Sequence, residues 1–225
     1  MSAQDNELWQ RCWREQETAF HQESVNRQLI RFWPRLGLAP GARVFVPLCG
    51  KSLDMLWLAA QGHEVLGVEL SDIAVGAFFA ENGLKPLRRE LGPFTFWRSG
   101  RIGILRGDFF SLTAAHLGQV AAVFDRASLT ALPVAQRADY ALHLRRILPA
   151  AGKIFLLTTE EPEPGETTYR SHAPDEEIVR LYSDAFDIRL VQVESVLEPD
   201  PDPANPDLPR VEKKVYLLTP RPVVP

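Results

Sequence analysis

Apolar runs and amphipathic stretches alternate along most of the chain, which predicts short strands joined by helices. Strand-like apolar runs occupy residues 43–46, 64–68, 102–105, 120–125, 153–160, 187–197 and 211–218. Apolar residues at helical spacing predict helices over residues 52–60, 71–82, 133–148 and 175–186. Strands that alternate with helices form a parallel sheet with crossover connections. The last two runs have no helix between them, so we expect them to pair as antiparallel neighbours.

The residues at the predicted helix starts suit those positions. Ser52, Ser71 and Asp175 can each accept a hydrogen bond from a free backbone N–H at a helix N-terminus. Pro133 is expected at the first position of its helix, where no N–H is needed. The sequence "FTFWRSGRIGIL" predicts a hairpin that turns at residues 99–100, with the strand at residues 102–105 as its second arm.

The N-terminal part of the chain has a different pattern. Residues 7–32 place apolar side chains among Arg, Gln and Glu at mostly helical spacing, which predicts an amphipathic helix, or two helices joined near residues 19–23. Gly37, Pro40 and Gly41 then end the helical pattern. We therefore expect a single domain over residues 1–225, with a helical lid at residues 1–36 and a core at residues 37–225.

Seven strands that end in an antiparallel pair predict an α/β fold of the Rossmann-like, class I type of S-adenosylmethionine-dependent methyltransferases. The sheet is expected to be mostly parallel, with an antiparallel last strand. In open sheets of this kind the ligand lies beyond the carboxyl ends of the strands, where the strand order reverses. This rule points to the loops that follow residues 46, 68, 105 and 124.

Composition narrows the range of partners. The chain has 225 residues, of which 45% are apolar, enough for one substantial core. Acidic residues outnumber basic ones by 29 to 25, which argues against nucleic acid and anionic lipid as partners. The sequence has neither a signal-peptide pattern nor an apolar stretch of membrane-spanning length, so we expect a cytoplasmic protein, and a monomer. Cys12 and Cys49 are too few for a disulfide framework, and no Cys/His spacing predicts a metal site.

The loop "PLCGKS" at residues 47–52 limits the choice of cofactor. No G-x-G-x-x-G follows the first strand, which counts against NAD or FAD. The last three residues of the PLCGKS loop match the end of a P-loop motif. The glycine that begins that motif would have to stand at position 45, which is Phe, and this counts against ATP as the ligand. S-adenosylmethionine has no phosphate and can use a loop with a single glycine. The alternative is an ordinary strand-to-helix turn with a serine cap.

Two acidic residues follow strands at the predicted ligand edge. Glu69 ends the second strand, where a carboxylate can accept hydrogen bonds from both ribose hydroxyls of an adenosine; the alternative is a solvated acid. Asp108 follows the third strand, where it can either meet the adenine edge or cap the next turn.

A cation and an aromatic stripe complete the candidate site. Arg126, next to Asp125, ends the fourth strand beside the expected methyl-transfer centre, although a structural salt bridge is a rival interpretation. Trp9 and Trp13 share one helix face. Such stripes commonly pack on a core, but a positively charged sulfonium also favours aromatic faces.

Four segments together resemble the thiopurine S-methyltransferase family, in its bacterial type. They are "WQRCWREQETAFHQESVNRQL", "RVFVPLCGKSLDMLWLAAQGHEVLGVELS", "VFDRASLTALP" and "VEKKVYLLT", and the similarity extends from Trp9 to Thr219. The resemblance implies transfer of the S-adenosylmethionine methyl group to the sulfur of thiopurines and other aromatic or heterocyclic thiols. For bacterial members it also implies selenium or tellurium species as acceptors.

The resemblance also implies roles for individual residues. Trp13 matches the lid tryptophan that contacts the cofactor, and Leu48 and Glu69 match the loop and ribose positions. Arg126 matches the arginine near the cofactor and the acceptor, and Phe20 is a further contact, expected on the acceptor side.

Two segments depart from the family pattern. Asp108 lies in a third-strand region that differs from vertebrate relatives, which have a serine in that neighbourhood. The proline-rich segment at residues 198–209 is expected to border the acceptor pocket, so it bears on substrate preference.

The expected chemistry is in-line attack of a thiolate on the methyl carbon. Aromatic thiols ionise readily, so no strong base is required, and Arg126 would favour the anionic acceptor. Two other functions fit parts of the sequence. A non-catalytic S-adenosylmethionine or nucleoside-binding module would need the same loops, whereas a nicotinamide oxidoreductase is disfavoured by the missing glycines.

Overall fold

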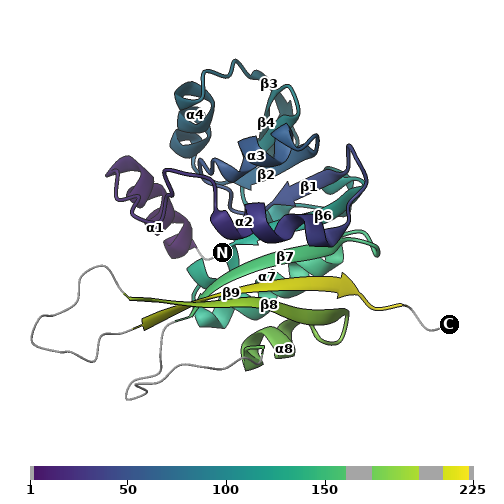
Figure 1. The fold of residues 1–225 in the computed structure, drawn as a ribbon. Coiled ribbons are helices and arrows are strands. Elements are labelled where there is room, and N and C mark those ends of the chain that lie inside the picture. The colour runs from purple at the N-terminus through teal and green to yellow at the C-terminus, as the bar shows by residue number, and fades with distance from the viewer. Residues whose placement is uncertain (1–2, 161–173, 198–209, 223–225) are drawn as a thin grey trace, which may run out of the picture.

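The computed structural model describes residues 3–160, 174–197 and 210–222, and a single sheet runs through the whole of it (Figure 1). The strands are β1 (Arg43–Val46), β2 (Glu64–Glu69), β3 (Leu87–Leu91), β4 (Phe94–Ser99), β5 (Ile102–Arg106), β6 (Val120–Arg126), β7 (Lys153–Glu160), β8 (Phe186–Leu197) and β9 (Arg210–Pro220). The helices are α1 (Ala3–Arg14), α2 (Arg27–Phe32), η1 (Trp33–Leu36), α3 (Asp54–Ala60), α4 (Asp72–Glu81), η2 (Phe109–Ser111), α5 (Ala114–Leu117), α6 (Ser128–Ala131), α7 (Val134–Ile147) and α8 (Glu176–Tyr182).

The strand order is β3-β4-β5-β2-β1-β6-β7-β9-β8. The five strands from β5 to β7 are parallel, and β9 lies antiparallel between β7 and β8. Strand order reverses at β1, so the loops after β1 and β6 meet at the carboxyl edge of the sheet. The predicted class I methyltransferase fold, with its parallel core and its antiparallel final pair, is confirmed.

The sheet has nine strands rather than the predicted seven, because β3 and β4 extend one edge as antiparallel strands. The hairpin arm β4 was expected, but β3 was missed. Its sequence, LRREL, is charged, and four of its five residues are exposed. Charged side chains protect an edge strand from pairing with other chains, and they remove the apolar alternation that would have announced it.

Two of the expected helix starts are confirmed. The Ser71 hydroxyl accepts a hydrogen bond from Ala74 N at the start of α4, and the Asp175 carboxylate accepts one from Glu177 N at the start of α8. Helix α8 ends at Tyr182, earlier than expected, because β8 begins at Phe186.

The other two helix starts are shifted. Helix α3 begins at Asp54, and Leu53 occupies the capping position expected for Ser52. The Ser52 hydroxyl nonetheless accepts a hydrogen bond from Asp54 N at 3.2 Å. Pro133 precedes α7 as its capping residue instead of forming its first position.

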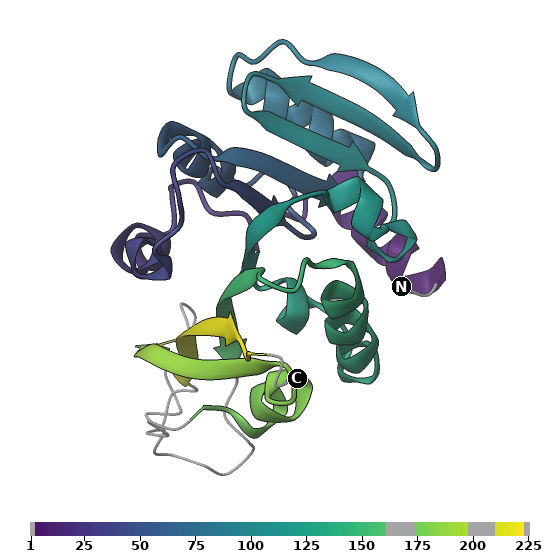
Figure 2. The ribbon, with the colours of Figure 1, turned by 90° about the vertical axis from the view of Figure 1, so that its right-hand side faces the viewer.

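Helices cover both faces of the sheet, as the rotated view shows (Figure 2). Neighbouring residues of β1 face opposite sides: Phe45 packs into one hydrophobic cluster, whereas Val44 and Val46 pack into the other. Within the described residues, no helix combines the length and the apolar character needed to cross a membrane.

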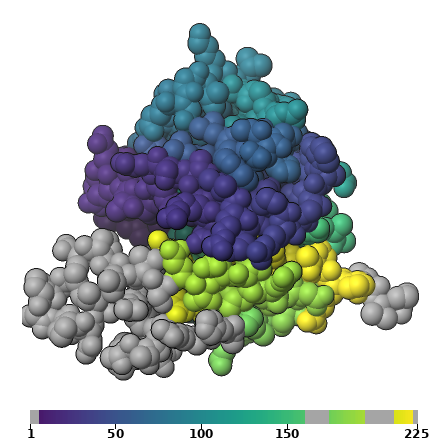
Figure 3. All heavy atoms as spheres, in the orientation of Figure 1, coloured from purple at the N-terminus to yellow at the C-terminus, as the bar shows by residue number. Residues whose placement is uncertain are grey.

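The N-terminal segment divides into two parts. Trp33 of η1 is buried, with its ring centroid 5.7 Å from that of Phe155 on β7, so α2 and η1 belong to the core. Helix α1 instead packs near α4. Figure 3 shows the N-terminal residues, in purple, as a continuous part of the molecular surface. The segment available to act as a lid is therefore α1 and the turn after it, rather than all of residues 1–36.

A buried carboxylate fixes the loop after β6. Asp125 is fully buried; its Oδ2 accepts a hydrogen bond from the Tyr140 hydroxyl at 2.7 Å, and its Oδ1 accepts one from Ser128 N at 3.0 Å. Burial raises the pKa of the Asp125 carboxyl, and the hydrogen bond from Tyr140 acts in the opposite direction. Helix α7 is thus tied to the carboxyl end of β6, where Arg126 lies.

Replacing Tyr140 by Phe should destabilise the protein by about 1.5–3 kcal/mol, the usual contribution of a hydrogen bond to a charged group. Tyr182→Phe is the matched control, because the buried Tyr182 hydroxyl has no hydrogen-bond partner among the described residues. Tyr182→Phe should lower the free energy of unfolding by no more than about 0.5 kcal/mol, or raise it. Urea unfolding followed by circular dichroism measures both, and equal losses for the two variants would contradict this account of the loop.

Candidate functional site

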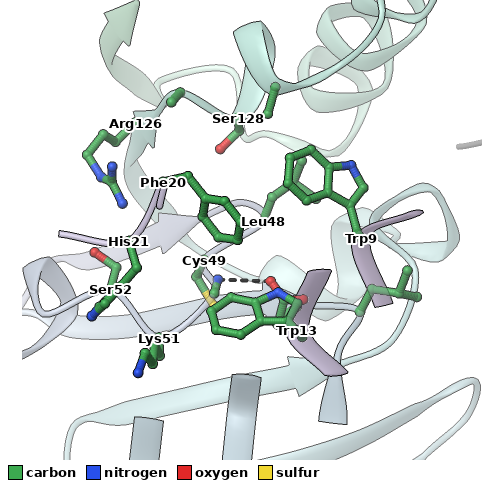
Figure 4. A pocket seen from close by; sticks show the side chains of 15 residues that line it. Trp9, Trp13, Phe20, His21, Leu48, Cys49, Lys51, Ser52, Arg126 and Ser128 are labelled. Atoms are coloured by element: carbon green, nitrogen blue, oxygen red, sulfur yellow. Dashed lines mark hydrogen bonds between the residues drawn. The ribbon is translucent and has the colours of Figure 1, made fainter. Parts of the chain in front are cut away.

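A cavity lies at the carboxyl edge of the sheet, where the loops after β1, β2 and β6 meet the N-terminal segment (Figure 4). Its lining residues are Trp9, Trp13, Phe20, His21, Leu48, Cys49, Gly50, Lys51, Ser52, Glu69, Leu70, Arg126, Ala127, Ser128 and Ala131. Its volume is about 110 Å³. Small-molecule sites usually enclose about 300–1,000 Å³, so this cavity is smaller than a typical ligand site.

The loop after β1 has an unusual backbone. Leu48 has a φ of 43°, a left-handed conformation that is strained for a branched side chain, and Gly50 has a φ of 52°. Cys49 N donates a hydrogen bond to Val68 O at 2.9 Å, which holds the loop against β2. The Cys49 side chain is buried over Gly67, where an added Cβ would lie 2.7 Å from Sγ. The thiol therefore fills a gap that only a glycine at position 67 leaves open.

Glu69 holds two of these loops together. Its Oε2 accepts a hydrogen bond from Gly50 N at 2.9 Å, and its Oε1 accepts one from Ser71 N at 2.8 Å. Burial raises the pKa of the Glu69 carboxyl, while these two hydrogen bonds act in the opposite direction. Each carboxylate oxygen can accept more than one hydrogen bond, so acceptor capacity is left for a ligand.

Asp125 and Arg126 separate although they are neighbours in the sequence. Asp125 faces the core, whereas Arg126 faces the cavity, because successive side chains of β6 point to opposite sides. The next residue, Ala127, has a φ of 61°. Ser128 then donates a hydrogen bond from Oγ to Pro47 O at 2.9 Å, which ties the β6 loop to the β1 loop. Two of the three non-glycine residues with positive φ in the described chain, Leu48 and Ala127, thus lie in the cavity wall.

Arg126 has a buried counter-ion that the sequence did not reveal. Its Nε lies 3.3 Å from Oδ2 of Asp54, in an ion pair without hydrogen-bond geometry. The Asp54 side chain is only 2% exposed. Burial raises the pKa of its carboxyl; the hydrogen bond from Asn26 N and the charge of Arg126 act in the opposite direction. Asp54 reads in the sequence as a solvated acid in a first helical turn, and its only signal was its place directly after the PLCGKS loop.

Three aromatic side chains close the cavity from the N-terminal side. The Phe20 ring lies edge-on to Trp9 and to Trp13, with centroids 5.5 Å apart in both cases. The Trp13 indole is buried against the β1 loop, and a Cβ added at Gly50 would lie 3.1 Å from its Cζ2. The glycine of the PLCGKS loop therefore provides the room for this indole.

Polar residues that the sequence analysis did not assign also reach the cavity. His21 lines it beside the aromatic group (Figure 4), and burial, followed by the charge of Lys51, lowers the pKa of its imidazole, which is neutral at neutral pH. Lys51 itself pairs with Glu81 at 2.8 Å. The "FHQ" stretch was a signal for His21, but the sequence offered no partner that suggested a base.

Five of the six predicted site residues line this one cavity: Trp13, Phe20, Leu48, Glu69 and Arg126. Asp108 does not. Its carboxylate accepts a hydrogen bond from Phe110 N at 3.1 Å and caps η2, which is the alternative that its position left open. The proline-rich segment at residues 198–209 lies outside the described residues. In the described part of the chain, no three His, Cys, Asp or Glu side chains group as metal ligands, and the expectation of no metal stays a prediction.

The chain matches the family model described as "Thiopurine S-methyltransferase (TPMT)" over residues 4–221. A thiopurine S-methyltransferase of Stutzerimonas stutzeri is 55% identical over 219 residues, which cover 97% of this chain and 92% of that protein. One of Bordetella petrii is 44% identical over 214 residues, which cover 95% and 98%.

Solved structures with much lower sequence identity share the fold. A SAM-dependent methyltransferase from Anabaena variabilis superposes with a TM-score of 0.65 at 16% identity, covering 96% of this chain and 95% of that one. The 1,6-didemethyltoxoflavin-N1-methyltransferase of Burkholderia thailandensis, solved with S-adenosylhomocysteine, has a TM-score of 0.62 at 17% identity, covering 95% and 87%. These structural matches confirm the expected fold. The family model and the relatives confirm the expected S-methyltransferase class and, with it, S-adenosylmethionine as the cofactor. The chain belongs to the thiopurine S-methyltransferase family.

Proposed function

We propose that this protein transfers the methyl group of S-adenosylmethionine to the sulfur of thiopurines and of other aromatic and heterocyclic thiols, and that selenium or tellurium species are further acceptors. The observation that carries the proposal is the convergence of an aromatic lid, a buried carboxylate and an arginine on one cavity at the switch point of the sheet. We further propose that the protein works in the cytoplasm as a monomer.

The cofactor is placed by its charges and hydroxyl groups. Glu69 would accept hydrogen bonds from the ribose hydroxyls, because it retains acceptor capacity beyond its bonds to Gly50 N and Ser71 N. Trp13 and Phe20 would hold the sulfonium, because aromatic faces attract cations. The Burkholderia methyltransferase of the same fold holds S-adenosylhomocysteine, which supports a nucleoside ligand for this kind of sheet.

The acceptor is placed by Arg126. No described residue accepts a hydrogen bond from its terminal nitrogens, so they remain free for an anionic thiolate. The enzyme then works mainly by holding thiolate and methyl group at attack distance, a contribution of about 7–11 kcal/mol in favourable model reactions. Thiolate and methyl carbon form the new bond as the bond from carbon to the sulfonium breaks, leaving S-adenosylhomocysteine.

Arg126→Ala should lower kcat/KM for aryl thiols roughly 10- to 150-fold, the equivalent of the about 1.5–3 kcal/mol of a charge-assisted hydrogen bond. The assay follows methyl-labelled S-adenosylmethionine into thioether products over a panel of aryl thiols, with selenium and tellurium oxyanions as further acceptors. Arg145→Ala is the control, because this half-buried arginine pairs with Asp184 at 2.8 Å, away from the cavity.

Three outcomes of this assay separate the possibilities. Labelled thioether from the unaltered protein supports the proposed reaction. Saturable binding of S-adenosylhomocysteine without any product would instead indicate a non-catalytic binding module. Equal activity of the Arg126→Ala and Arg145→Ala variants would remove Arg126 from the acceptor site.

Gly50→Ala tests the packing of the lid on the loop. The added methyl group would meet the Trp13 indole at 3.1 Å. Affinity for S-adenosylhomocysteine should fall roughly 5- to 150-fold, the equivalent of the about 1–3 kcal/mol that overpacking usually costs. Gly37→Ala is the matched control: its φ of 59° resembles that of Gly50, and no atom lies within 4 Å of the added Cβ. Calorimetric titration that gave equal affinities for both variants would contradict the proposed lid contact.

The pH dependence of activity should be set by the pKa of the acceptor thiol rather than by a titrating group of the enzyme. Since the pKa of His21 is lowered by burial, its imidazole stays neutral as pH rises from neutral, and only the thiol gains charge. Activity should therefore rise with pH through the pKa of each aryl thiol, and the midpoint should move when a more acidic thiol is used. A midpoint that stayed constant across the panel would instead reveal a titrating base in the protein.

A further inference from the structure

We propose that Asp54 is a positioning residue, which couples docking of the N-terminal segment to the placement of the Arg126 guanidinium; this inference rests on the proposed function. Asp54 does not line the cavity. It lies one layer behind it, at the point where three chain segments meet: the approach to α2, the end of the PLCGKS loop, and the carboxyl end of β6.

The two carboxylate oxygens of Asp54 face different segments. Oδ1 accepts a hydrogen bond from Asn26 N at 2.7 Å. Oδ2 accepts one from the Ser52 hydroxyl at 3.0 Å and lies 3.3 Å from Arg126 Nε. The Ser52 hydroxyl in turn accepts from Asp54 N at 3.2 Å, which restricts the carboxylate to this orientation. One nearly buried anion thus fixes the backbone on one side and a cation on the other.

Asn26 connects this anion to the lid. Its side-chain Oδ1 caps α2 by accepting from Gln28 N and Leu29 N, so its position is fixed by the core. Its Nδ2 donates to Gln22 at 3.2 Å, and Gln22 directly follows two cavity-lining residues, Phe20 and His21. Asn26 therefore joins the Asp54 carboxylate to the segment that carries two cavity-lining residues.

In the cavity wall, Arg126 forms an ion pair with Asp54, and His21, when protonated, also acts on the Asp54 carboxylate through its charge. Only 19% of the Arg126 side chain is exposed, and its Nε is buried and lacks a hydrogen bond among the described residues. A guanidinium in this environment depends on a counter-charge for its position, because an unpaired buried charge is strongly disfavoured. With Nε facing Asp54, the two terminal nitrogens of Arg126 are left for the acceptor.

Asp54→Asn separates the charge from the hydrogen bonds. The asparagine oxygen can still accept from Asn26 N, and its amide can donate to the Ser52 hydroxyl, but the counter-charge to Arg126 is gone. We expect kcat/KM for an aryl thiol to fall about 10- to 100-fold, the scale of a misplaced reactive group. Affinity for S-adenosylhomocysteine should change less than about threefold, because the proposed cofactor contacts are untouched.

A double-mutant cycle provides the decisive readout. If Asp54 acts through Arg126, Asp54→Asn should have little further effect on kcat/KM in the Arg126→Ala background. Asp54→Glu keeps the charge and should recover part of the activity that Asp54→Asn loses. Asp184→Asn serves as the control for removing the acid of an ion pair elsewhere, and it should leave activity unchanged.

The proposal is overturned if Asp54→Asn lowers activity equally in both backgrounds, or lowers affinity for S-adenosylhomocysteine as strongly as it lowers activity. Should Asp54→Asn not fold, Ser52→Ala removes the hydroxyl that donates to the same oxygen and gives a milder test of the same non-additivity. These outcomes are distinct from failure of the proposed function, in which the unaltered protein would methylate no thiol.

Discussion

The Glu69 carboxylate is the interaction on which the site depends most. It ends β2 and accepts hydrogen bonds from Gly50 N of one loop and from Ser71 N of the next. A nearly buried carboxylate is costly unless its oxygens are paired, and here the partners are backbone groups that cannot move away without unfolding the loops. The carboxylate that joins these two loops is also the group that we propose as the acceptor for the ribose hydroxyls.

The positions of Asp125 and Arg126 follow from the alternation of side chains along β6. Asp125 points into the core, where it braces helix α7 through Tyr140, and Arg126 points into the cavity, where Asp54 provides its counter-charge. Asp125 thus contacts the core and Asp54 contacts the cation of the cavity wall, so the two carboxylates stabilise different parts of the site. Asp125 ties the loop after β6 to helix α7, and Asp54 is the residue that we propose to orient the Arg126 guanidinium. Strained backbone at Leu48 and Ala127 lies in the same wall, a pattern common at functional sites.

Much of the fold could be predicted because the central strands are rich in apolar residues and two of the helices, α4 and α8, begin at a recognisable capping residue. For Ser71, position along the chain was enough to predict the helix cap, and for Glu69 it was enough to predict a place at the cavity, while the ribose contact of Glu69 stays a prediction. Strand β3 could not be predicted, because an edge strand with exposed charges has no apolar alternation. Asp54 was missed for a related reason: an acid in a first helical turn normally faces water, and only the packing of Asn26 and Arg126 around it buries it. For Asp108 the sequence left two roles open; the structure shows the capping hydrogen bond to Phe110 N, and a contact with adenine stays a prediction.

The central claim is that the sugar of S-adenosylmethionine is held by Glu69 beneath the lid formed by Trp9, Trp13 and Phe20. A crystal structure of the protein soaked or co-crystallised with S-adenosylhomocysteine tests this most directly. The account predicts both ribose hydroxyls within hydrogen-bond distance of the Glu69 carboxylate, with the homocysteine sulfur on the side of the cavity that Arg126 faces. A nucleoside bound at another edge of the sheet, or a ribose that leaves Glu69 untouched, would contradict it.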